Sequence, residues 1–146
     1  MATVKGCNIP DDLYYNVENN VWARREADGT VTLGMTAYAA ALAGQIVSCT
    51  PKKVGRSVEQ NKSAATVESG KWVGPVKAPV AGEVIAVNAA LASTPATINA
   101  DPYGSGGMVR LKPANWDADS AGLVTGAAVA AAFEAKMNAE GFAGCA

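Results

Sequence analysis

Residues 63–88, SAATVESGKWVGPVKAPVAGEVIAVN, decide the fold of this chain. Two runs of small and β-branched residues flank a short polar turn at residues 68–71, which has Lys71 at its apex. Because β-branched residues favour strands, this pattern predicts a hairpin. Gly74 and Pro75 interrupt the second run, and proline donates no ladder hydrogen bond, so we expect that run at a sheet edge or a bulge.

Beyond the hairpin, Gly82 permits a second tight turn, and the valines and isoleucine of residues 84–87 predict another short strand. A lysine at a rigid hairpin tip presents its amine to solvent while strand pairing fixes the backbone on both sides. Lys71 therefore has two interpretations. It is either an ordinary solvated turn residue, which the spacing alone favours, or an amine that another enzyme acylates.

Length and charge limit the class of protein. At 146 residues the chain is expected to form one domain, residues 1–146, with its own core. Its net charge is −1 and its Lys and Arg residues are not clustered, so we expect no nucleic-acid and no membrane partner. The small apolar runs at 37–44 and 124–133 are too short to span a bilayer. No secretory signal is visible, and we expect a cytoplasmic protein.

The residue inventory argues against a self-sufficient enzyme. Histidine is absent, which removes the usual general base at neutral pH and the commonest metal ligand. Cys7, Cys49 and Cys145 lack metal-ligand spacing. The glycine-rich residues 104–107 are not followed by the lysine of a phosphate-binding loop. We therefore predict no catalytic residue and no metal site, and expect a carrier or a binding module.

The remaining segments predict short strands and two helical regions. Strands are expected at residues 13–15, 21–24, 31–35, 45–50 and 108–111, and a turn-like segment at residues 4–12. Thr36 is a good N-cap for a helix over residues 37–43 that Gly44 ends. A helical segment is expected at residues 117–140, broken near 125–126, with a core-facing stripe of Leu123, Val124, Val129, Phe133 and Met137.

The hairpin motif resembles a known family. The run ESGKW followed by VKAPVAGEV resembles the modification hairpin of glycine cleavage system H proteins, relatives of lipoyl and biotinyl domains. The PKKVG turn at 51–55 and the INADPYG run at 98–104 are similar as well, and the resemblance extends from about Tyr14 to Trp116. It implies a mainly β, lipoyl/biotinyl-type barrel-sandwich hybrid with a short internal helix and C-terminal helices.

The same resemblance implies a cofactor and residues around it. Lipoate would be attached covalently to Lys71, and Gly70 and Trp72 would lie near the arm. Biotinyl domains place methionines at those two positions, so lipoate fits better than biotin. A lipoate–protein ligase or equivalent machinery would recognise Glu68 and Gly82. Glu68 equally fits a solvated strand-end acid, and Gly82 a turn glycine required by backbone geometry.

A lysine with a pKa near 10.4 is protonated at neutral pH, so its acylation needs an activated donor. The attached group would then supply the chemistry, and the protein a tether and a docking surface. The resemblance also allows dihydrolipoamide dehydrogenase as a partner.

Two stretches depart from the glycine-cleavage pattern. Residues 19–22 read NNVW where that family has a histidine-containing EHEW run, and residues 104–107 lack the tryptophan of GEGW. With the opening VKGCNIPDDLYY and the closing GFAGC, they resemble the lipoate-binding proteins of the sulfur-oxidising heterodisulfide-reductase-like (sHdr) system. This implies that the arm shuttles sulfur or redox equivalents while thiosulfate-derived sulfane sulfur is oxidised to sulfite, with the heterodisulfide-reductase-like complex as partner. Two alternatives stay open: a glycine cleavage carrier of an aminomethyl group, and an unmodified interaction domain.

Cysteines and tryptophans remain to be placed. Cys7 and Cys145, near the two ends, are either free thiols, as is usual in a reducing compartment, or a redox pair that exchanges with the dithiolane or with each other. Cys49 lies in an apolar strand and is expected in the core. Trp22 and Trp116 could serve the core or a docking surface.

Overall fold

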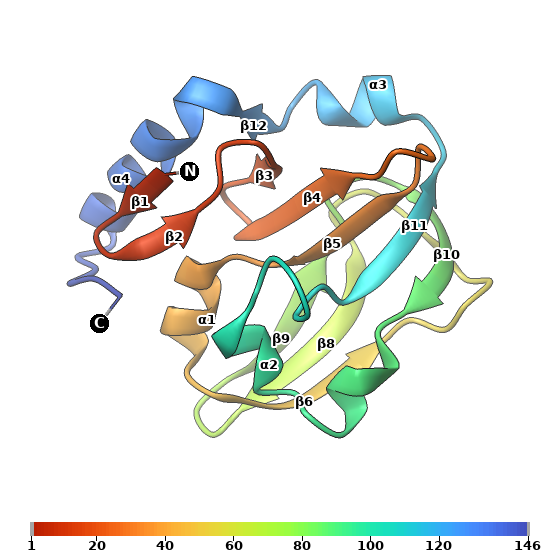
Figure 1. The fold of residues 1–146 in the computed structure, drawn as a ribbon, viewed down its shortest axis with the longest axis horizontal. Helices are drawn as coiled ribbons and strands as arrows, with labels where there is room; N and C mark the ends of the chain where they lie inside the picture. The colour runs from red at the N-terminus through yellow and green to blue at the C-terminus, as the bar shows by residue number, and fades with distance from the viewer. Residues whose placement is uncertain (1, 146) are drawn as a thin grey trace.

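The computed structural model describes residues 2–145, which form two packed β sheets, an N-terminal hairpin and short helices (Figure 1). A seven-stranded sheet has the order β12-β3-β4-β5-β11-β10-β7. Its strands are β3 (Tyr14–Asn16), β4 (Val21–Arg25), β5 (Val31–Met35), β7 (Ser57–Val58), β10 (Gly82–Val87), β11 (Val109–Pro113) and β12 (Val124–Thr125). A three-stranded sheet contains β6 (Ile46–Pro51), β8 (Ser63–Ser69) and β9 (Val73–Lys77), with β8 in the centre.

The N-terminal hairpin pairs β1 (Ala2–Val4) with β2 (Cys7–Ile9). The helices are α1 (Ala37–Ala43), η1 (Ala89–Ala92), α2 (Thr97–Ala100), α3 (Trp116–Ser120), η2 (Gly126–Ala128) and α4 (Val129–Ala139). Strand β1 and helix α4 lie on the same side of the molecule (Figure 1). Among residues 2–145, none of the helices has the length and apolar character needed to cross a bilayer.

Two hydrophobic clusters hold these elements together. The larger one lies between the two sheets and contains Leu33, Val84 and Leu111 from the larger sheet and Val67 and Val76 from the smaller, all nearly inaccessible to solvent. Burial of each such side chain stabilises the fold by about 1.5–3 kcal/mol. The second cluster joins the N-terminal hairpin and α4 to the outer part of the larger sheet and includes Tyr15, Trp22, Tyr38, Phe133 and Met137.

Several local predictions are confirmed. Helix α1 spans the expected residues, the Thr36 side chain accepts a hydrogen bond from the Ala39 N–H, and Gly44 ends the helix with φ of 83°. Strand β9, which contains Gly74 and Pro75, lies at the edge of its sheet. An edge strand tolerates proline, because only one of its sides is paired and the missing N–H can face away from the sheet. The mainly β composition is also as predicted.

The N-terminal prediction is wrong. Residues 4–12 are not simply turn-like, because β1 and β2 form a paired hairpin around Lys5 and Gly6, which both have positive φ. Val4, Cys7 and Ile9 are buried in the second cluster, where α4 packs on β1. Burial against a segment more than a hundred residues away stabilises these short strands, and that contact is invisible in the local sequence.

The C-terminal helical segment is broken near residues 125–126, as predicted, but the helical assignment just before the break is wrong. A strand, β12, interrupts the expected helical segment and pairs with β3, placing Val124 opposite Tyr15. The Thr125 hydroxyl donates to the Leu13 carbonyl at 2.7 Å, which fixes this strand at the sheet edge. Val124 therefore belongs to a strand and not to a helical stripe. Of the expected stripe, Val129, Phe133 and Met137 are buried on α4, whereas Leu123 and Val124 are only partly buried.

Candidate functional site

Lys71 lies at the tip of the β8–β9 hairpin, as its spacing predicts. The Ser69 N–H donates to the Trp72 carbonyl at 2.8 Å, which closes the turn around Gly70 and Lys71. The Lys71 side chain is exposed. Both ion pairs found within residues 2–145 use Glu26, with Arg24 or Arg110, so neither involves Lys71. The amine is therefore presented to solvent on a turn with a fixed backbone.

Ser69 is a positioning residue that sequence reasoning missed. Its hydroxyl is buried, donates to the Ala43 carbonyl at 2.6 Å and accepts from the Lys71 N–H at 3.3 Å. The hairpin tip is thus tied to the last residue of α1. Serine in a turn commonly bonds to nearby backbone, which was a usable signal. The bond to Ala43 joins residues 26 positions apart and could not be predicted.

The loop after α1 supports the Lys71 side chain. A Cβ atom on Gly44 would lie 3.1 Å from Cε of Lys71, so the absence of a side chain there leaves room for the lysine stem. The Asn99 side chain makes two hydrogen bonds to this loop. Its amide donates to the Gly44 carbonyl at 2.9 Å, and its oxygen accepts from the Ile46 N–H at 2.9 Å. Two hydrogen bonds with Asn99 thus hold the loop against which the Lys71 stem lies.

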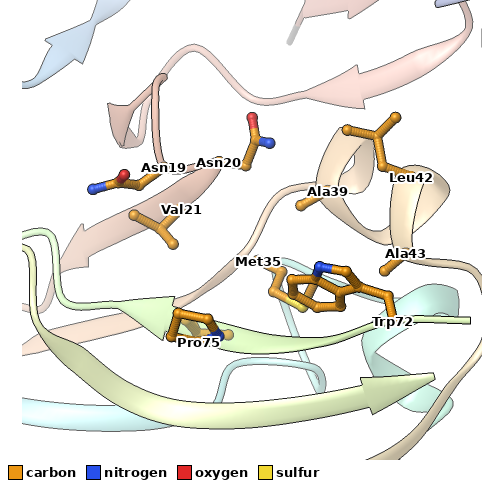
Figure 2. A pocket seen from close by; sticks show the side chains of 10 residues that line it. Asn19, Asn20, Val21, Met35, Ala39, Leu42, Ala43, Trp72 and Pro75 are labelled. Carbon is orange, nitrogen blue, oxygen red and sulfur yellow. The ribbon is translucent and has the colours of Figure 1, made fainter.

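A pocket of about 210 Å³ opens beside the hairpin tip (Figure 2). The turn before β4, strand β5, helix α1 and the hairpin all contribute to it. Its lining residues are Asn19, Asn20, Val21, Met35, Ala39, Leu42, Ala43, Trp72, Pro75 and Val76. Figure 2 shows Asn20 and Leu42 on opposite sides of the opening, and Trp72 and Met35 line the same pocket. None of these lining residues, all in the described part of the chain, has a charged side chain, so the pocket offers apolar surface and two amides.

Trp72 forms one wall of this pocket. Its indole folds back over Gly74, where an added Cβ would come within 2.2 Å of the ring, so only glycine leaves space for this rotamer. Trp72 remains 39% exposed, whereas Trp22 and Trp116 are buried in the two clusters. The latter two are thus core residues, and Trp72 is the tryptophan next to Lys71.

Glu68, Gly70 and Gly82 occupy different surroundings. Glu68 and Gly70 are exposed at the tip beside Lys71. Gly82 lies beyond the other end of the hairpin, at the start of β10, where it is buried and pairs with Pro113 and Val58. The expected turn role of Gly82 is wrong, because Gly82 is a strand residue paired on both sides. A Cβ would lie 2.5 Å from the Lys112 carbonyl oxygen, so glycine is required by the close approach of β11.

The two terminal cysteines form a disulfide, with their Cα atoms 5.0 Å apart. The expectation of free thiols is therefore wrong in this structure, and the interpretation as a pair fits. Cys7 and Cys145 line a hollow with Ala37, Ala40 and Ala41 of α1, whereas Ala39, Leu42 and Ala43 of that helix line the pocket. The disulfide and the pocket thus adjoin different faces of α1.

Cys49 packs against the main core, as expected, although it stays partly accessible. Burial raises the pKa of its thiol to about 11. Because the thiolate is the reactive form, Cys49 is a poor nucleophile at neutral pH.

Comparison with known proteins agrees with this geometry. A family model described as "Glycine cleavage H-protein" matches residues 13–136. Glycine cleavage system H protein 5 of Aquifex aeolicus is 55% identical over 119 residues, covering 79% of this chain and 80% of that protein. H protein 2 of the same organism is 49% identical over 122 residues, covering 84% and 76%.

A solved structure supports the fold as well. The crystal structure of a glycine cleavage system H protein from Mycobacterium marinum superposes with a TM-score of 0.73 at 32% identity, covering 90% of this chain and 99% of that one. The expected barrel-sandwich fold is thereby confirmed.

Proposed function

Because this chain belongs to the glycine cleavage H-protein family, we propose that it is a lipoyl carrier whose arm is attached to Lys71. The observation that carries the proposal is an exposed lysine on a closed hairpin tip, next to an uncharged pocket. In the loading step the Lys71 ammonium would first give up a proton, and its neutral amine would attack an activated lipoyl carbonyl. An amide bond would form, the activating group would leave, and the second amine proton would pass to solvent, so that the lysine carries no charge.

The residues around Lys71 fit an attached lipoyl group. Its aliphatic chain needs apolar surface, which Met35, Leu42 and Trp72 offer in the pocket. Ser69 and Gly44 fix where the lysine stem leaves the protein. When bound, lipoate supplies a disulfide ring that opens to two thiols. The protein's own contribution is to orient the arm and to shield it from water.

Recognition by a lipoate ligase is proposed to use the hairpin. Glu68 is exposed on the strand that leads into the tip and is available for direct contact. Gly82 is buried, so it would act indirectly by letting β10 and β11 approach and thereby setting where the hairpin stands. Once the cargo has left and the arm remains as a dithiol, dihydrolipoamide dehydrogenase would oxidise the two thiols back to the disulfide.

Two chemical groups are candidates for the cargo of the arm. The names of the relatives favour an aminomethyl group carried within glycine cleavage. A sulfur cargo passed to a heterodisulfide-reductase-like complex is the second candidate, and the pocket lining favours it. Asn19 and Asn20 supply neutral amides there, and an ammonium group in this pocket would lack the carboxylate that usually compensates its lost hydration. A sulfur atom bonded between the two lipoyl sulfurs carries no charge and would have no such cost.

The attachment site is tested by incubating the protein with lipoate, ATP and a lipoate–protein ligase and measuring intact and peptide masses. We expect one lipoyl group, on Lys71. Lys71→Arg should stay unmodified, while Lys77→Arg, an exposed lysine on the same hairpin, should be modified normally. Lipoylation on a different lysine, or none on the wild type with an active ligase, would contradict the proposal.

The cargo is tested with the loaded carrier. In a glycine decarboxylase assay with the partner proteins of that system, aminomethyl carriage predicts turnover that depends on Lys71. Sulfur carriage predicts no such turnover and a sulfane-sulfur adduct on the reduced arm after incubation with a persulfide donor.

A further inference from the structure

The turn before β4, residues 17–20, forms one side of the pocket. Within it, the Asn19 N–H donates to Oδ1 of Asn16 at 3.0 Å and the Asn19 side-chain amide donates to Oδ1 of Asn61 at 3.3 Å. Asn19 and Asn20 line the pocket from this turn. Asn20 has φ of 57°, a left-handed conformation that asparagine tolerates better than most residues. Backbone bonds from Asn20 N–H to the Val17 carbonyl, 3.3 Å, and from Thr36 N–H to the Asn20 carbonyl, 3.2 Å, are both long. Asn19 is thus held by Asn16 and Asn61, whereas the backbone of Asn20 is held by two bonds at the upper limit of normal length.

Helix α4 supports the turn through a single lysine. The Lys136 ammonium lies 2.7 Å from the Val17 carbonyl, 2.8 Å from the Glu18 carbonyl and 3.0 Å from Oδ1 of Asn20. An ammonium has three donors, and all three have a partner in this turn. The side chain is partly buried and reaches across from a helix about 116–119 residues later in the chain.

Helix α4 is itself firmly anchored. Val129, Phe133 and Met137 are buried in the second cluster, and Phe133 packs edge-on against Tyr15 with ring centroids 5.3 Å apart. The residues after the helix contact α1, which forms the other side of the pocket. There Tyr38 packs on Phe142, with centroids 4.7 Å apart. Helix α4 and the residues that follow it therefore contact both sides of the pocket.

We infer that Lys136 is a positioning residue for the carrier arm, which holds the Val17–Asn20 turn in place and so sets how closely the pocket encloses the lipoyl group. This inference rests on the proposed function for the arm, but its structural part can be tested without the arm. Loss of the ammonium leaves the Val17 and Glu18 carbonyls to water and frees Asn20 to move away from Trp72. The pocket then encloses the arm less.

The first measurement is amide hydrogen exchange in the unlipoylated protein. Lys136→Met keeps the apolar stem and removes the donors, and Lys53→Met, an exposed lysine whose side chain has no hydrogen bond among residues 2–145, is the matched control. We expect the Asn20 and Thr36 amides to exchange about tenfold faster in Lys136→Met, because hydrogen bonds to a charged donor are lost. Amides in the β5–β11 ladder and the melting temperature of Lys53→Met should not change.

Lys136→Arg separates positioning from a general role in stability. It keeps the positive charge and several donors, and should restore most of the protection at Asn20 and Thr36. If Lys136→Met lowers protection equally across β5, β11 and the turn, or leaves the turn unchanged, Lys136 does not position the turn and the inference is wrong.

The second measurement uses the lipoylated protein. The lipoyl disulfide in Lys136→Met should be reduced several-fold faster by a soluble phosphine than in the wild type, with Lys136→Arg in between. An unchanged rate with a loosened turn would overturn the inference while leaving lipoyl carriage intact. If Lys71 accepts no lipoyl group, the proposed function fails, and the exchange data still decide whether Lys136 holds the turn.

Discussion

Reduction of the Cys7–Cys145 disulfide should lower the stability of the protein substantially. The bond joins residues 138 positions apart, so it closes nearly the whole chain into one loop. For a loop of this length, the chain-entropy relation gives about 5 kcal/mol of stabilisation, with measured disulfides usually contributing about 2–4 kcal/mol. A domain of this kind has a total stability of about 5–15 kcal/mol. The reduced protein should therefore be folded but much less stable.

Part of the terminal contact does not depend on the disulfide. The Cys145 N–H donates to the Lys5 carbonyl at 2.9 Å, and Phe142 packs on Tyr38, so the C-terminal segment should remain docked under mild conditions. We expect the melting temperature to fall by about 5–15 °C, since each kcal/mol corresponds to about 2–4 °C at this size.

The assay is guanidinium unfolding of the unlipoylated protein with and without dithiothreitol, with thiol alkylation and mass analysis to count reduced cysteines. Cys49 is free, so the reductant acts on one bond only. The double variant Cys7→Ser/Cys145→Ser should match the reduced wild type and should not respond to reductant. If the wild type is fully reduced and its unfolding free energy changes by less than about 0.5 kcal/mol, the loop-entropy reasoning is refuted.

Three further changes test the site and the core. Gly74→Ala should push the Trp72 indole out of the pocket and increase acrylamide quenching of its fluorescence, and unchanged quenching would show that the ring does not need this space. Gly82→Ala should destabilise the fold by about 1–3 kcal/mol in chemical unfolding, because the new Cβ overlaps the β11 backbone, whereas Gly122→Ala, which meets open space, should be nearly neutral. Burial and the hydrogen bond to Glu140 raise the pKa of Tyr38 to about 12. The protonated Tyr38 hydroxyl therefore contributes to stability below pH 10, and this contribution is lost as the pH rises to 12. Tyr38→Phe should reduce that alkaline loss in a pH series of unfolding curves, and an unchanged slope would contradict the assignment.

The sequence alone determined the local features of the site. The β8–β9 hairpin, the placement of Lys71 and Trp72 at its tip, and helix α1 with Thr36 and Gly44 at its ends all follow from it. Each depends on residues within about four positions of one another: turn residues between β-branched runs, a hydroxyl that caps its own helix, a glycine with positive φ. Such signals are complete in the local sequence, and the tertiary structure only confirms them.

Only the tertiary structure decided how these parts meet. The anchoring of Ser69 to Ala43, the contact of Lys136 with the turn before β4, and the pairing of Cys7 with Cys145 join residues that are from 26 to 138 positions apart. Strand β12 likewise exists because β3 offers it a free edge. The physical reason is that a pocket wall, a buried polar bond or an edge strand is stabilised by a partner from elsewhere in the chain, and no local pattern specifies which partner folding will bring there.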